Sequence, residues 1–133
     1  LCAQAVEVTY NADNSIKVDK VYAVIDLGVA VNPDNVKNQV EGAIVMALSA
    51  ATKPGITLKS GMVQQHNFYD NPLPRINEIP DTEIYILTDG GKMKGVGEPG
   101  VPPFAPALAN AIFAATSKRI RRMPFDINNL SSA

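Results

Sequence analysis

The sequence predicts an α+β fold in which short antiparallel strands pack with two largely buried helices. Three features carry this prediction: an alternating apolar pattern near the N-terminus, a second alternating stretch after residue 82, and two long uncharged stretches with helix signals. A length of 133 residues suits one modest hydrophobic core. We therefore expect residues 1–133 to form a single domain.

The first predicted element is a β-hairpin. Residues 4–10 alternate in the manner of a strand, and NADNS at 11–15 supplies turn residues. Apolar residues then recur from Ile16 to Val24, and AVIDLG at 23–28 ends the second strand or forms a third. This pattern indicates two paired strands at the start of the chain.

A helix is predicted from Pro33 to about Ala51. Asn32 can act as the N-cap, Pro33 favours the first helical position, and Asp34 interacts favourably with the positive end of the helix. Gln39 lies at the edge of the apolar face. That face consists of Val36, Val40, Ala43, Ile44, Ala47, Leu48 and Ala51. From Gly42 onward the helix carries no charge, which predicts that it is enclosed on all sides.

The rest of the chain combines loop, strand and a second helix. KPG at 53–55 ends the first helix, and the prolines that follow indicate mostly loop up to residue 80. EIYIL at 83–87 is typical of a strand, and PALANAIFAATSK at 106–118 is typical of a helix with a proline near its start. Because Asn110 is the only interior polar residue before Thr116, we expect this helix to be buried on all sides as well.

Composition excludes several classes of partner. The net charge of −1 provides no attraction for nucleic acid or for anionic lipid, and no apolar run is long enough to span a bilayer. Cys2 is the only cysteine, so the sequence supports neither an internal disulfide nor a thiolate metal cluster, and we assign Cys2 no role. Only 19% of residues are charged and the chain begins with Leu, so we expect a piece of a larger assembly.

The stretch GVGEPG at 95–100 matches the glycine pattern of dinucleotide-binding turns. Such a turn follows a strand directly and opens a helix whose amides hold the pyrophosphate. Here residues 88–94 separate the motif from the predicted strand, and Pro99, Pro102 and Pro103 remove amide donors. No acidic residue follows at the spacing that would read a ribose hydroxyl. The sequence therefore argues against a nucleotide site.

The same stretch is suited to holding one carboxylate, that of Glu98. Gly95 and Gly97 allow close approach of the main chain to a ligand, Val96 presents an apolar wall, and Pro99 fixes the exit from the loop. Burial there would raise the pKa of the Glu98 carboxyl and make it an effective base near neutral pH. The simpler alternative is an exposed glutamate in a turn, and these residues alone favour it.

Three segments together resemble one family. NPDNVKNQVEGA at 32–43, KGVGEPG at 94–100 and PPFAPALANAIFAATSKRIRRMPF at 102–125 are similar to the C-terminal part of the molybdopterin-binding (large) subunit of the xanthine dehydrogenase and aldehyde oxidase family. The branch that the chain resembles is the large, or beta, subunit of bacterial isoquinoline 1-oxidoreductase. The resemblance implies that the α+β fold is a lobe of a larger molybdenum-binding subunit.

The resemblance also implies roles for individual residues. Glu98 matches the glutamate beside the metal and would act as the base when an electron-poor carbon of an N-heteroaromatic or aldehyde is hydroxylated with water. Gln39 matches a glutamine that hydrogen-bonds the cofactor, although a helix-flank amide that contacts backbone or water is the alternative. The resemblance places Lys94, Gly95, Val96 and Gly97 in the loop that lines the cofactor, and it assigns no metal ligand to this chain.

Cofactors and partners follow from the resemblance in the same way. It implies molybdopterin, usually as the cytosine dinucleotide in bacteria, and 2Fe–2S clusters on a small partner subunit, because this chain lacks the cysteines that such clusters need. The remainder of the molybdenum subunit is a further implied partner. We expect the 133-residue chain alone to be inactive. A non-catalytic binding domain that associates with itself remains the alternative.

Several positions depart from the family pattern. Ser117 stands where glycine commonly ends the last helix, and Asn71 and Pro74 replace a tyrosine and a leucine typical of the branch. These last two changes bear on the substrate pocket. His66 has no companion that would suit a metal site, and KRIRR at 118–122 is interpreted as a solvated helix end or a subunit contact.

Overall fold

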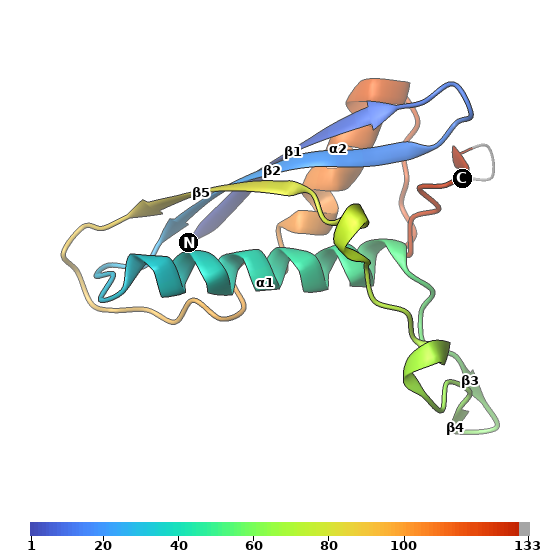
Figure 1. Cartoon of the computed structure of the whole chain (residues 1–133), viewed down its shortest axis with the longest axis horizontal. Coiled ribbons are helices and arrows are strands. Elements are labelled where there is room, and N and C mark those ends of the chain that lie inside the picture. The colour runs from blue at the N-terminus through green and yellow to red at the C-terminus, as the bar shows by residue number, and fades with distance from the viewer. Residues whose placement is uncertain (131–133) are drawn as a thin grey trace.

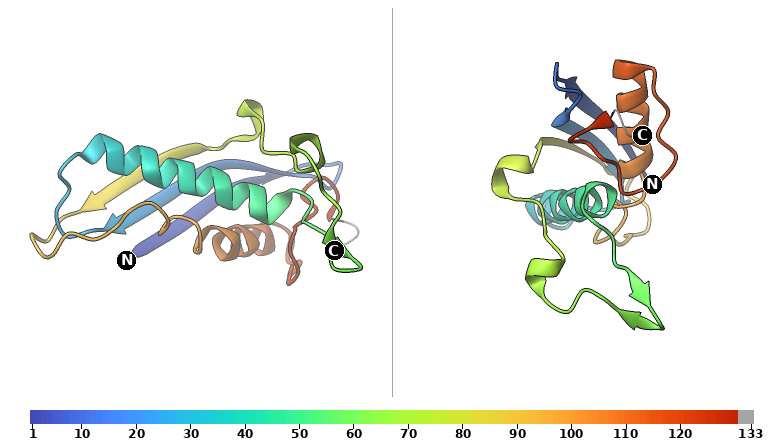
Figure 2. Two further views of the ribbon diagram at one scale, coloured as in Figure 1. Left: turned by 90° about the horizontal axis from the view of Figure 1, so that it is seen from below. Right: turned by 90° about the vertical axis from the view of Figure 1, so that its right-hand side faces the viewer.

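The computed structural model of the chain, which describes residues 1–130, contains a three-stranded sheet with both long helices on one of its faces (Figure 1, Figure 2). The sheet order is β1-β2-β5. The main elements are β1 (Cys2–Tyr10), β2 (Ile16–Asp26), α1 (Pro33–Thr52), β5 (Asp81–Leu87) and α2 (Phe104–Thr116). The predicted α+β class is therefore confirmed.

Strands β1 and β2 form the predicted antiparallel hairpin. Glu7 pairs with Lys20 while Val8 pairs with Val18, so Asp19 is an extra residue that bulges from β2. A bulge reverses which residues face the helices, because side chains alternate along a strand. It allows Val18 and Val21, which lie an odd number of positions apart, both to be buried in the core.

Strand β5 lies beside β2 but runs parallel to it, from the Lys20–Asp81 pair to the Asp26–Leu87 pair. The sheet is therefore mixed, whereas the sequence predicts antiparallel strands throughout. The connection explains the difference, since α1 carries the chain back along the sheet and β5 can then start at the same end as β2. Parallel pairing brings the ends of β2 and β5 to one edge, where the candidate site begins.

Helix α1 has the predicted start but a narrower buried surface than predicted. The Asn32 side chain accepts a hydrogen bond from the Asn35 amide at 3.1 Å, and Pro33 occupies the first turn. All seven residues of the predicted apolar face are buried. Met46, however, is 57% exposed, so α1 is not enclosed on all sides within this chain. Part of α1 is exposed because the single sheet covers only one face of the helix.

Helix α2 packs against β1 and likewise buries one face, that of Phe104, Leu108 and Ile112. The other faces of α2 are at least partly exposed, which corrects the prediction of burial on all sides. Ser117 ends the helix in the left-handed conformation with φ of +60°. The structure thus places a serine in a conformation that favours glycine, at the position where the family resemblance expects glycine.

Residues 53–80 form an arm that projects from the sheet and helices (Figure 1). The sequence predicts mostly loop here. The structure adds a small hairpin of two strands, each two residues long, β3 (Leu58–Lys59) and β4 (Met62–Val63). It also adds two short 3-10 helices, Phe68–Asp70 and Ile76–Glu78. Lys53 forms an ion pair with Glu78 at the base of the arm. Exposed apolar side chains along the arm are Ile56, Leu58, Met62, Val63, Phe68, Tyr69, Leu73, Ile76 and Ile79.

Candidate functional site

The candidate site is built on residues 94–100, which we call the site loop. It lies in the connection between β5 and α2, and this connection passes alongside α1 (Figure 1). Neither end of the motif meets a strand or a helix, since β5 ends at Leu87 and α2 begins at Phe104. The dinucleotide interpretation therefore lacks the strand–turn–helix geometry that it needs, as the sequence indicates.

Close packing of the site loop on α1 depends on Gly100. A Cβ atom at this buried position would lie 3.0 Å from the Ala43 Cβ and 3.3 Å from the Val40 carbonyl oxygen. Both distances are shorter than ordinary van der Waals contacts, so a larger residue would push the loop away from the helix. Glycine at this position lets the main chain of the loop rest directly on the helix.

The same packing brings the loop beside Gln39. A Cβ atom at Gly97 would lie 3.7 Å from the Gln39 Oε1 atom, so these two predicted site residues are neighbours although they lie far apart in sequence. Glu98 follows Gly97 directly, and its carbonyl oxygen accepts a hydrogen bond from the Val101 amide at 2.9 Å. This turn fixes the main chain immediately after Gly97. The main chain at Gly97 thus lies beside a carboxamide, and the residue that bears the predicted catalytic carboxylate comes next in the chain.

The Glu98 side chain is exposed in this chain. Exposure is the alternative that the residues of this chain alone favour, and burial of the carboxylate stays a prediction for the complete subunit. Gly95 and Gly97 have no side chains that could cover a neighbouring carboxylate, and nothing lies within 4 Å of a Cβ atom built at Gly95. Glycines can bring a main chain close to a ligand, but they cannot provide the apolar cover that desolvates a carboxyl group.

The donors of the site loop suit an anionic, hydrogen-bonding cofactor such as a molybdopterin. Within residues 1–130, the amides of Gly95, Val96 and Gly97 donate to no protein acceptor. Gly95 and Gly97 leave open space where other residues would place a Cβ atom. The exposed Gln39 carboxamide adds both a donor and an acceptor. The residues present therefore fit such a group.

Lys94, at the start of the site loop, is bound to the end of β2. Its Nζ atom lies 3.2 Å from Oδ1 and 3.1 Å from Oδ2 of Asp26, and its amide donates to the Leu27 carbonyl at 3.0 Å. The hydrogen bond from the ammonium group lowers the pKa of the Asp26 carboxyl below its ordinary value. The charge of Lys94 is thus directed towards the protein itself.

Sequence reasoning missed two residues that shape the site. Gln4 in β1 donates from Nε2 to the Gly100 carbonyl at 2.8 Å, and Gly28 after β2 has φ of +82°. A Cβ atom at Gly28 would lie only 2.4 Å from the Lys92 carbonyl oxygen. A signal existed for Gln4, because it occupies an inward position of an alternating strand between Cys2 and Val6. For Gly28 the sequence contained a weaker signal, namely that a glycine directly follows a buried strand.

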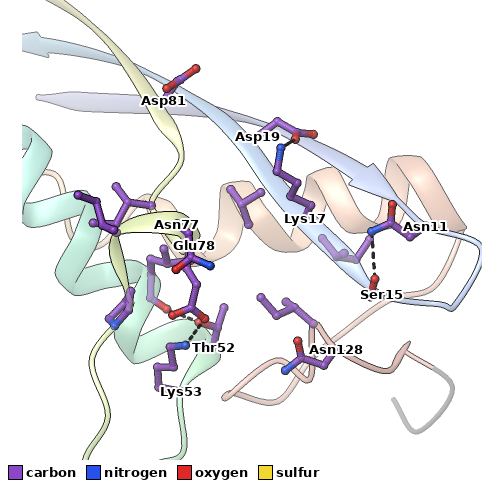
Figure 3. Close-up of a pocket in the computed structure, with 17 residues that line it drawn as sticks. Asn11, Ser15, Lys17, Asp19, Thr52, Lys53, Asn77, Glu78, Asp81 and Asn128 are labelled. Atoms are coloured by element: carbon purple, nitrogen blue, oxygen red, sulfur yellow. Dashed lines mark hydrogen bonds and ion pairs between the residues drawn. The ribbon is translucent and has the colours of Figure 1, made fainter.

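A pocket of about 470 Å³ lies elsewhere, near the C-terminal end of α1 (Figure 3). None of its lining residues is among the predicted catalytic or cofactor-binding residues, although one of them, Pro74, departs from the family pattern. Of its charged groups, Lys17 pairs with Asp19 at 2.8 Å and Lys53 pairs with Glu78, and Asp81 also lines the pocket. His66 is exposed and lies outside the pocket. Within the described residues no group of three or more metal-ligating side chains is gathered.

Residues 1–80 match the family model described as a molybdopterin cofactor-binding domain. The match covers more than half of the chain, so the chain belongs to this family and is a molybdopterin-binding domain of the large subunits of xanthine dehydrogenase-type enzymes. Together with the relatives that cover most of the chain, this match confirms the resemblance that the three sequence segments indicate. No helix among residues 1–130 has the length and apolar character that crossing a membrane requires.

Individual relatives agree with this assignment. The chain is 33% identical over 119 residues to the isoquinoline 1-oxidoreductase subunit beta of Brevundimonas diminuta, which covers 89% of this chain and 15% of the relative. It is 31% identical over 129 residues to the aldehyde oxidoreductase molybdenum-binding subunit PaoC of Escherichia coli K12, with 91% and 18% covered.

A solved structure supports the fold. The aldehyde oxidoreductase of Desulfovibrio gigas superposes with a TM-score of 0.69 at 27% identity, covering 90% of this chain and 14% of that one. The chain therefore spans less than a fifth of the relatives that it matches.

Proposed function

We propose that residues 1–133 are a lobe of the large subunit of a molybdenum hydroxylase that uses water to hydroxylate an electron-poor carbon of an N-heteroaromatic or aldehyde substrate. The observation that carries the proposal is the approach of Gly97, the residue before Glu98, to Gln39 on α1, in a chain with oxidoreductase subunits among its relatives. The remainder of the subunit and a small subunit with 2Fe–2S clusters complete the proposed enzyme.

In this proposal the site loop and α1 hold the cofactor, molybdopterin in its cytosine dinucleotide form. When bound, the cofactor supplies the oxygen-transfer and electron-accepting chemistry. The amides of Gly95, Val96 and Gly97 donate hydrogen bonds to its polar groups, and the Gln39 carboxamide fixes its orientation from α1. Lys94 contributes its main chain to the same lining. Since the amides of Gly95, Val96 and Gly97 are unpaired within residues 1–130, their binding to the cofactor costs no internal hydrogen bonds.

Glu98 is the proposed base. Its carboxylate takes a proton from the attacking oxygen at the reacting centre, and the Val101–Glu98 hydrogen bond holds its main chain in place. A base of this kind works best when water is excluded around it. Because Glu98 is exposed in this chain, the proposal requires the rest of the subunit to cover it. We therefore expect the 133-residue chain alone to retain no molybdenum and to catalyse no reaction.

The test is Glu98→Gln in the complete enzyme, with Glu41→Gln as a matched control. Glu41 is an exposed glutamate on the same helix as Gln39, and its glutamine can still accept the hydrogen bond from Thr82. Loss of a general base lowers turnover by roughly 10²–10⁴-fold. We expect Glu98→Gln to show that loss with an unchanged molybdenum content by mass spectrometry, and Glu41→Gln to resemble the wild type. Near-normal turnover of Glu98→Gln would remove Glu98 from the base role.

The alternative, a non-catalytic domain that associates with itself, draws on the exposed apolar side chains of the arm, such as Phe68 at 92% exposure and Ile76 at 90%. The same surface serves equally well to pack against the rest of a large subunit. Metal analysis of the protein purified with its neighbouring subunits separates the two. Stoichiometric molybdenum supports the hydroxylase, and its complete absence supports the binding domain.

A further inference from the structure

We propose that Asp26 and Gln4 are positioning residues that clamp the site loop at its two ends, and that the Lys94 ammonium serves this clamp rather than contacting the cofactor. The inference rests on the proposed function, because it assigns a purpose to the position of Glu98. It concerns residues on β1 and β2, outside the loop and outside the glycine motif.

The first end of the loop is held at the carboxyl end of β2. Asp26 receives the Lys94 ammonium on both carboxylate oxygens, at 3.2 and 3.1 Å, and its Oδ1 also accepts from the Gly28 amide at 3.3 Å. The carboxylate therefore joins the side chain of Lys94 to the main chain of the tight turn after β2. Two main-chain bonds reinforce this end, from the Lys94 amide to the Leu27 carbonyl at 3.0 Å and from the Gly90 amide to the Gly28 carbonyl at 3.2 Å.

The second end of the loop is held by β1. Gln4 Nε2 donates to the Gly100 carbonyl at 2.8 Å, and Gly100 itself is buried against α1. The Gln4 Oε1 atom is buried and accepts no hydrogen bond from the described residues. An apolar side chain at this inward position would avoid that unpaired acceptor. The glutamine side chain interacts with Cys2, its neighbour on β1, and its hydrogen bond to the Gly100 carbonyl is the one that reaches the site loop.

The two attachments enclose the residues that the proposed function uses. Between Lys94 and Gly100, the amides of Gly95, Val96 and Gly97 have no internal partner among the described residues, and the Val96 side chain packs against the core. Hydrogen bonds to β1 and β2 are therefore made only at the two ends of the loop. Loss of either attachment would let Glu98 move relative to Gln39. Small errors in the position of a catalytic group lower the rate of the chemical step more than they weaken binding of the substrate.

The Lys94 ammonium has one recorded ionic partner, Asp26, and the side chains are 46% and 26% exposed. This makes the Asp26–Lys94 pair an anchor of moderate strength, comparable in exposure to the Lys20–Glu83 pair in the same sheet, at 32% and 41%. The Lys20–Glu83 pair connects β2 to β5 and has no contact with the site loop. It therefore provides a matched control.

The experiment is a double-mutant cycle in the complete protein with Asp26→Asn, Lys94→Gln and the double variant. Asparagine at position 26 can still accept from the Gly28 amide. Hydrogen exchange of the peptide covering residues 94–100, measured by mass spectrometry with and without cofactor, is the first readout, and kcat and KM are the second. We expect each single variant to exchange about two- to fivefold faster and to lose kcat by a similar factor at unchanged KM, and the double variant to be no worse.

The cycle distinguishes the clamp from a direct contact with the cofactor. If the ammonium bound the cofactor, Lys94→Gln would lose molybdenum or raise KM while Asp26→Asn would do neither. The double variant would then resemble Lys94→Gln alone, and this result would overturn the proposal. The cycle built from Lys20→Gln and Glu83→Gln should leave exchange at residues 94–100 unchanged. An equal effect of the control pair would also overturn the assignment.

Gln4→Met tests the second attachment, since methionine matches the length of glutamine but cannot donate to Gly100. We expect faster exchange at residues 98–101 and a lower kcat at unchanged KM, with unchanged exchange in α1. Unchanged exchange at residues 98–101 would refute the role of Gln4.

The hydrogen-exchange readout does not depend on which residue is the catalytic base. If Glu98→Gln kept full turnover while the exchange effects appeared, the proposed function would fail and the clamp would stand. If turnover fell with Glu98→Gln but exchange never changed, the clamp would fail alone.

Discussion

Replacement of Gly28 by alanine tests the close approach between the end of β2 and the segment that leads to the site loop. Gly28 has φ of +82°, and an added Cβ atom would lie 2.4 Å from the Lys92 carbonyl oxygen and 2.9 Å from that of Gly91. Gly90→Ala is the matched control, because Gly90 has φ of +74° and nothing within 4 Å of its added Cβ atom. Both variants carry backbone strain, and only Gly28→Ala adds a clash.

The magnitude follows from these two contributions. A left-handed conformation costs a non-glycine residue about 1–2 kcal/mol. Forced repacking around an inserted carbon adds about 1–3 kcal/mol, and here the neighbour is main chain that cannot rotate away. Gly28→Ala should therefore destabilise this junction by about 2–5 kcal/mol, against about 1–2 kcal/mol for Gly90→Ala. Each 1.4 kcal/mol corresponds to roughly a tenfold change in an equilibrium constant.

Amide hydrogen exchange of Gly90 and Lys94 is the assay, because these amides bond to the Gly28 and Leu27 carbonyls across the junction. We expect exchange to accelerate by roughly 30-fold or more in Gly28→Ala and by roughly 5- to 30-fold in Gly90→Ala. Equal acceleration in the two variants would show that the 2.4 Å approach does not exist, and the account of this junction would then be refuted.

Two further predictions concern Ser117 and Asp26. Ser117→Gly should raise the free energy of unfolding by about 1 kcal/mol, because φ of +60° strains serine and suits glycine; a lower urea midpoint would contradict this. The pKa of Asp26 lies below its ordinary 3.8 because Lys94 donates to the carboxylate, so the Asp26 contribution is full above pH 3.8 and is lost as the pH falls through the lower folded-state value. In Lys94→Gln the pKa of Asp26, measured by carboxyl NMR, should return towards 3.8, and an unchanged pKa would count against the pair.

Local signals in the sequence were sufficient for most elements of the fold. Asn32 and Pro33 marked the start of α1, the turn at 11–15 marked the first hairpin, and the seven apolar positions of α1 are all buried. These features depend on neighbouring residues, so a single sequence contains them. The direction of β5 depends on a pairing with β2 across roughly 60 residues, and its own alternating pattern is equally compatible with either direction.

In the candidate site too, features set by neighbouring residues could be predicted from the sequence, and features set by distant residues could not. The glycine motif identified the loop, and the structure places Gly97 beside Gln39, but no local pattern could connect Gln4 or Asp26 to residues about 70–95 positions away. Burial of Glu98 could not be predicted from glycines alone, because covering atoms must come from elsewhere. Apolar residues on both long helices led to an expectation of full enclosure, yet one sheet can cover only one side of each helix.

The arm, residues 53–80, has a consequence for how proteins with this architecture diversify. It leaves from the end of α1 and returns to the start of β5, and the Lys53–Glu78 pair closes it at its root. Residues between these points can be lengthened, shortened or exchanged without changing the register of β5 on β2. The architecture therefore separates the arm from the sheet and the two long helices, and chimaeras that exchange only residues 54–77 should keep the register of β5 on β2.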